Sequence, residues 1–145
     1  MVFRRCAVVV AVLLLCAAAL ALPQVFDRVP LFTGAEQYTF YAGSQSSTAR
    51  IVLCEGGQAA RVRRGLGALS GESARYASAE DAFAQVRRLG GELLFREEAA
   101  GTVNYYYRSR RLTGGVSLGG KTVNLHVAVR GAGACVGSPI IFGGY

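Results

Sequence analysis

The sequence predicts an α+β fold, in which a curved antiparallel sheet carries one or two helices on one face. Short segments rich in aromatic and β-branched residues recur along the chain, and many of its 19 glycines separate them. Residues 78–89 have the apolar spacing of an amphipathic helix. Only strand-like segments follow that helix, so the strands near the C-terminus are expected to pair as hairpins.

The N-terminal residues have the pattern of an export signal. Two arginines precede an unbroken apolar run at residues 6–22, and Ala19 and Ala21 have the spacing that a signal peptidase reads. Two alternatives stay open, namely cleavage before Leu22 or an uncleaved anchor, because the run lies at the short limit for spanning a bilayer. We therefore expect an exported, extracytoplasmic protein whose residues 1–21 are a signal peptide or a membrane anchor.

The rest of the chain has the length of one domain. Residues 22–36 hold two of the three prolines and are expected to be a linker, so the domain would span residues 37–145. The elements expected in its first half are strands at 38–43 and 48–54 joined as a hairpin, a helix at 58–69, a turn at 71–73 and a short strand at 74–77.

Residues 78–89 give the clearest helix. Ser78 can cap its N-terminus, acidic residues follow in the first turn, and Arg87 and Arg88 lie in the last turn, where the helix dipole favours cations. Gly90 is a suitable C-terminal stop. The strands expected after it lie at 92–97, 102–109, 112–118, 122–129 and 135–143. The last is expected either at a sheet edge or with a bulge at Pro139, because proline cannot donate a ladder hydrogen bond.

The strand at 122–129 has a two-residue period. Its apolar residues share one face, which we expect to be buried: Val123, Leu125, Val127 and Val129. The apolar run that follows, with Ile140 or Phe142, is expected to pack against the same core. His126 lies on the opposite, polar face, which predicts a solvated or hydrogen-bonded histidine and little effect of replacing it.

The charge of the chain suggests one kind of partner. It has 16 Lys and Arg against 9 Asp and Glu, a net charge of +7, which favours polyanions such as an anionic wall polymer. The alternative is that positive charge only keeps a small domain soluble. If the first holds, the candidate binding residues are Arg61, Arg63, Arg64, Arg108, Arg110 and Arg111. Tyrosines and arginines alternate at residues 104–111, a pattern that can stack nucleobases or sugars, but a half-buried aromatic layer is the simpler interpretation.

Two cysteines remain after the apolar run, Cys54 and Cys135. Outside the cytoplasm they could form a disulfide. The alternative is two free thiols that pack as small apolar side chains.

The patterns that carry catalysis or metal binding are missing from the sequence. His126 is the only histidine, so no histidine pair is available for a metal or for proton transfer. Glu97 and Glu98 are adjacent and would point to opposite faces of a strand. We therefore expect a non-enzymatic protein without a cofactor or metal.

The C-terminal residues 116–145 resemble the signature of the YwmB family, which is labelled TATA-box-binding-protein-like for its fold. The residues that match are Val123, Asn124, Leu125, Ala128, Arg130, Val136, Gly137, Ser138, Pro139 and Ile141. The resemblance implies an exported domain with no known activity, and a role in the cell envelope or in sporulation. Since an exported protein meets no promoter, we expect its partner to be an envelope protein or wall polymer and not DNA. Contact with a membrane would come only from an uncleaved N-terminus.

Overall fold

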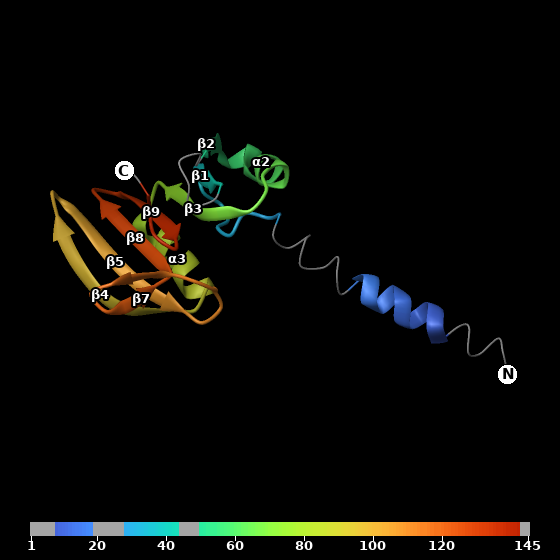
Figure 1. Ribbon diagram of the computed structural model, residues 1–145. Helices are drawn as coiled ribbons and strands as arrows, with labels where there is room; N and C mark the ends of the chain where they lie inside the picture. Colours follow the sequence, from blue (N-terminus) through green and yellow to red (C-terminus); the bar gives the residue numbers. More distant parts are fainter. Residues whose placement is uncertain (1–7, 19–27, 44–49, 143–145) are drawn as a thin grey trace.

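The structure, a computed structural model, describes residues 8–18, 28–43 and 50–142 (Figure 1). Residues 8–18 form an exposed helix that lies away from the rest of the protein in Figure 1. Among the described residues, no helix combines the length and the apolar character needed to cross a membrane.

The domain is a seven-stranded antiparallel sheet with helices on one face, which confirms the predicted fold class. Its strands lie in the order β2-β1-β3-β9-β8-β5-β4, and β6 and β7 form a separate hairpin. The elements in chain order are β1 (Gln37–Ala42), β2 (Arg50–Glu55), the 3-10 turn η1 (Gly56–Gln58), α2 (Ala59–Gly65), β3 (Leu69–Tyr76), α3 (Ala79–Arg88), β4 (Gly91–Ala99), β5 (Thr102–Ser109), β6 (Val116–Leu118), β7 (Lys121–Val123), β8 (Leu125–Arg130) and β9 (Gly133–Ser138).

Helix α3 forms as its capping residues predict. The Ser78 hydroxyl accepts a hydrogen bond from the Asp81 N–H at 3.2 Å, and Gly90 ends the helix with a φ of 65°. Its apolar side turns to the sheet, where Ala82 and Val86 are buried. The helix therefore covers the middle of the sheet, and in Figure 1 it lies behind β8 and β9.

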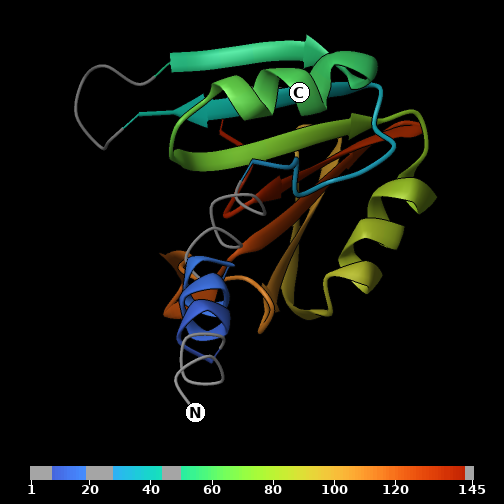
Figure 2. The same cartoon turned by 90° about the vertical axis from the view of Figure 1, so that its right-hand side faces the viewer.

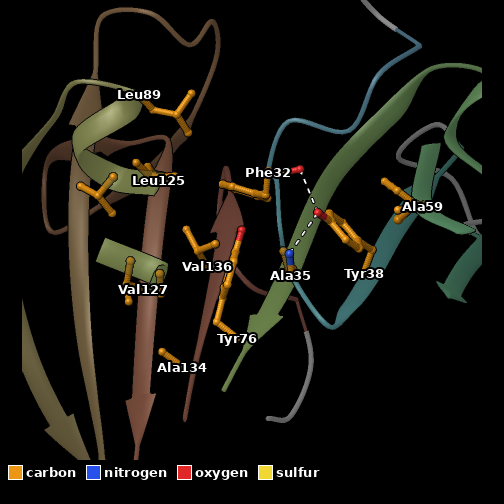
Figure 3. Close-up of a cluster of buried hydrophobic side chains, with 14 of the residues drawn as sticks. Phe32, Ala35, Tyr38, Ala59, Tyr76, Leu89, Leu125, Val127, Ala134 and Val136 are labelled. Carbon is orange, nitrogen blue, oxygen red and sulfur yellow. Dashed lines mark hydrogen bonds between the residues drawn. The ribbon is translucent and has the colours of Figure 1, made fainter. Parts of the chain in front are cut away.

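The core lies between the sheet and its two helices (Figure 3). Phe40, Leu125, Val127 and Val136 are completely buried there, and Ala59 of α2 belongs to the same cluster. Leu125 and Val127 belong to this cluster and Val129 is partly buried against it, which confirms the predicted core face at these positions. Val123 is completely buried, as predicted, but lies outside the cluster.

The expected linker at 22–36 is wrong in its second half. Phe32 is completely buried, and its N–H donates to the Glu72 carboxylate at 3.3 Å. The hydroxyl of Tyr38 donates to the Phe32 carbonyl (Figure 3). The hydroxyl of Tyr76 donates to the Thr33 carbonyl. The domain thus begins before the first strand. The first half of the expected linker lies outside the described residues.

The region between residues 58 and 77 differs from the prediction. Helix α2 ends at Gly65, four residues early, and β3 runs unbroken from Leu69 through the expected turn at 71–73. Gly71 does not turn the chain. A Cβ on it would lie 2.9 Å from the Phe142 ring, so glycine is needed for close packing.

The last strand lies at no edge and has no bulge at Pro139, so both alternatives expected for it are wrong. Strand β9 lies between β3 and β8, near the middle of the sheet. It ends at Ser138, so Pro139 takes no part in the ladder and imposes no edge. The strand expected at 122–129 is divided at Asn124 into β7 and β8, and the one expected at 112–118 is reduced to the three residues of β6.

Candidate functional site

The face of the sheet opposite the helices, here called the open face, carries a hollow of about 120 Å³. Strand register explains its composition, because Gln37 pairs with Arg75 and Arg75 with Cys135, and the next row holds Thr39 and Ser73. These polar residues alternate with core residues along the same strands. Leu53, Tyr41, Ala74 and Ile141 complete the lining.

Four polar side chains of the hollow have donor or acceptor groups that other described residues do not use. Within the part of the chain that the structure describes, the side chains of Gln37, Thr39, Ser73 and Arg75 form no hydrogen bond with another residue. Gln37 and Arg75 are exposed, whereas Ser73 is buried. The hollow therefore offers a guanidinium, an amide and two hydroxyl groups to a ligand.

Cys135 is the one thiol in the hollow. Burial raises the pKa of this thiol, and the neighbouring Arg75 guanidinium only partly opposes the rise. The thiol therefore stays protonated near neutral pH. Since the thiolate is the nucleophile, Cys135 contributes to the shape of the hollow more than to reactivity.

One wall of the hollow comes from residues 139–142, here called the C-terminal strap, which fold back over the open face. Ile141 lies over Gly137, where a Cβ would come within 2.8 Å of its side chain. The Phe142 ring meets Tyr41 edge to face at 5.1 Å, and the Tyr41 hydroxyl donates to the Phe142 carbonyl. The prediction that this apolar run packs on the helix-side core is therefore wrong, because it packs on the opposite face.

The strap also buries His126, which is only 4% exposed. The ring stacks on Tyr106 at 4.6 Å, and Tyr106 stacks on Phe95 at 4.5 Å. The Ile141 N–H donates to Nδ1 at 3.3 Å, so this nitrogen is unprotonated. The Nε2–H then donates to Asn104 Oδ1 at 3.0 Å. The predicted hydrogen bonding is thus present, whereas solvent exposure is not.

Burial lowers the pKa of His126 from 6.5 to about 4, and the Glu97 carboxylate opposes this only in part. The imidazole is neutral near pH 7, and both of its nitrogens are engaged. It is a structural partner of the strap, since neither nitrogen is available for proton transfer to a ligand.

The six arginines considered for polyanion binding do not form one surface. Arg61, Arg63 and Arg64 belong to α2 beside β1 and β2. Arg108 lies in β5 and Arg110 and Arg111 follow it, near the opposite end of the sheet (Figure 1). Arg63 is buried and donates to the Leu66 and Gly67 carbonyls.

Four of the five remaining arginines of this set also have local partners. Arg64 donates to the Ala60 carbonyl, and with Arg28 it lines a second hollow of about 420 Å³ beside α2. Arg108 donates to the Gly114 carbonyl and Arg111 to the Arg88 carbonyl. Arg110 is 4.0 Å from Glu92 in an exposed ion pair.

The two cysteines are not joined. Cys54 and Cys135 are both free thiols. Cys54 is in register with Tyr38, Ala74 and Val136 on the helix face, whereas Cys135 lies on the open face three strands away. At about 4.8 Å per strand, this separation far exceeds the reach of a disulfide. Of the two alternatives from the sequence, the structure supports two free thiols.

The polar residues of the hollow were not identified from the sequence. The alternation of Gln37 and Thr39 with Tyr38 and Phe40 was a usable signal for β1. No such signal was available for Ser73 and Arg75, because residues 71–73 resemble a turn. In the described ranges, histidine, cysteine and carboxylate side chains form no group of three that could hold a metal ion. Comparisons with family models, with curated proteins and with solved structures find no match to this chain, so the resemblance to YwmB stays a prediction.

Proposed function

We propose that this chain is an exported, non-enzymatic binding domain of the cell envelope, and that it holds a small anionic group of an envelope component in the open-face hollow. The observation that carries this proposal is the convergence of four polar side chains that form no hydrogen bond with another described residue: Gln37, Thr39, Ser73 and Arg75.

The chemistry of the hollow favours a carboxylate or a phosphate. Arg75 can donate two parallel hydrogen bonds to either group, and Gln37 and Ser73 can donate to the remaining oxygens. The volume of about 120 Å³ is well above the roughly 30 Å³ of one water molecule. Leu53 and Ile141 provide apolar walls for a short carbon chain attached to the anion.

The titratable groups next to the hollow favour binding over catalysis. The Cys135 thiol has a raised pKa, and His126 is neutral with both nitrogens hydrogen-bonded. A general base or nucleophile needs a pKa near the working pH and a free position facing the substrate. Neither group meets both conditions.

The export signal in the sequence supports an envelope location, where carboxylates and phosphates are abundant groups of wall polymers. A sporulation role follows from the resemblance to YwmB and is the narrower form of the same proposal. Polyanion binding through the six arginines gains no support from their arrangement.

The test is titration of the purified protein with acetate and with inorganic phosphate, followed by NMR of backbone and side-chain amides. We expect saturable shifts of the Gln37 side-chain amide and of residues in β3 and β9. Arg75→Gln should weaken binding about tenfold or more, because it removes the charged donor. Arg61→Gln, an exposed arginine on α2, is the matched control and should leave binding unchanged. Equal weakening by both substitutions, or no saturable shift with either anion, would refute the site.

A further inference from the structure

The seven-stranded sheet has two outer strands, β2 at one end and β4 at the other (Figure 2 shows β2 at the upper margin). The outer side of an edge strand presents N–H and C=O groups that no neighbour pairs, so it can template the addition of another strand. Proteins that stay monomeric protect such edges with charges, bulges or covering segments. The two edges of this sheet differ in that protection.

The β4 edge is well protected. Its register shifts between Leu93 and Phe95, which marks a bulge or irregularity, and charged residues 96–98 follow directly. The Lys121 ammonium donates to the Leu94 carbonyl at 3.1 Å, which places a further charge against this strand. Another strand could add here only by displacing these features.

The β2 edge lacks these features. Its sequence from Arg50 to Glu55 is RIVLCE, so both charges lie at the ends and four apolar residues lie between them. Its pairing with β1 continues without a register shift over all six residues. Ile51 and Leu53 point to the open face and are 61% and 60% exposed. This strand is therefore a regular, apolar edge whose charges lie only at its two ends.

The end charges of β2 distinguish between the two orientations in which a second copy of the chain could pair with this edge. A second copy that pairs in parallel would set Arg50 beside Arg50 and Glu55 beside Glu55, which like charges disfavour. An antiparallel second copy brings the Arg50 end of each strand alongside the Glu55 end of the other. The strand is thus complementary to itself in the antiparallel orientation.

We propose that β2 is a self-association edge, at which two copies of this chain pair antiparallel and form one continuous sheet. In a continuous antiparallel sheet, the side chains of directly opposed residues point to the same face. The two-fold axis must therefore lie where one residue opposes the same residue of the second copy, and not between two successive residues. With the axis at Val52, Ile51 of one copy meets Leu53 of the second, which covers both exposed side chains. The dimer is closed, because the protected β4 edges remain outside.

Sedimentation of the purified protein over about a hundredfold range of concentration tests this inference. We expect a reversible monomer–dimer equilibrium, together with slower hydrogen exchange of the amides in residues 50–55 at high concentration. Leu53→Lys should raise the dimer dissociation constant about tenfold or more, because each dimer loses two buried leucines and gains two charges at the axis. Ile51→Lys should act in the same way, and both exposed positions tolerate lysine in the monomer.

Leu93→Lys is the matched control, because Leu93 lies on the other edge strand and is 54% exposed. It should leave the dimer unchanged. A monomer throughout the concentration range would overturn the inference, and so would a dimer that is insensitive to Leu53→Lys or that is broken by Leu93→Lys. The hollow and its anion are tested through Arg75, so the two proposals can fail separately.

Discussion

His126 provides the sharpest test of the structure, because its burial makes stability depend on pH. In the folded chain Nδ1 accepts the Ile141 N–H, and Nε2 donates to Asn104. Protonation would turn Nδ1 into a donor that faces another donor, inside a site that is only 4% exposed. We therefore expect acid to weaken the contact between the C-terminal strap and the open face.

The sign and the size of this effect follow from the lowered pKa. The pKa of His126 is about 4 in the folded chain and 6.5 in the unfolded chain, so between these values the unfolded state binds more protons. The stabilisation is present above about pH 6.5 and is lost as the pH falls toward 4, in total about 3 kcal/mol. That loss is a large part of the 5–15 kcal/mol typical of a domain.

The assay is urea unfolding at about pH 7.5 and about pH 4.5, on the native sequence and on His126→Gln. The comparison is needed because burial raises the pKa of Glu72, which strengthens folding as the pH falls and so acts in the opposite direction. The native protein should lose about 2.5 kcal/mol more than the variant across this interval. Equal losses in the two proteins would show that His126 is not buried as described, and would refute the reasoning.

Three other outcomes are expected. Leu125→Ala should lower the free energy of unfolding by about 2–5 kcal/mol, whereas the exposed Leu93→Ala should change it little; similar melting temperatures for the two variants would contradict the assigned core face. Asn124→Ala should cost about 2–4 kcal/mol in chemical unfolding, because Asn124 bonds to both backbone groups of Ser109 and to the Leu112 carbonyl; a cost near zero would contradict these bonds. N-terminal sequencing of exported protein should begin at Leu22, and an intact N-terminus in the membrane fraction would instead indicate the anchor.

Local patterns predicted the secondary structure well wherever residues within a few positions of each other determine it. Ser78 and Gly90 limit α3 as expected, and the range 102–109 is reproduced by β5. Gly119 and Gly120, with φ of 55° and 74°, form the turn between β6 and β7, in the gap between the strands expected at 112–118 and 122–129. These features depend on backbone conformation and capping within a few residues.

The errors arise where distant residues decide the structure. Gly71 resembles a turn residue, but the Phe142 ring beside it explains the glycine. His126 lies on a face with polar residues and is nevertheless buried, because the strap returns over that face. The hollow could not be predicted for the same reason, since it depends on the pairing of β1, β3 and β9. Such long-range pairing leaves no local trace in the sequence.

The central place of β9 makes the order of synthesis matter. Its neighbours β3 and β8 both precede it in the chain, and Glu72 can pair with Ser138 only after all the residues between them have been made. Without β9, the strands β2-β1-β3 and β8-β5-β4 are two separate half-sheets. Pairing between strands so far apart in the sequence is slow, because the entropy cost of closing the loop comes before the stabilising contacts form. A chain whose C-terminal residues are still being synthesised therefore cannot close its sheet, and one truncated before Gly133 never can.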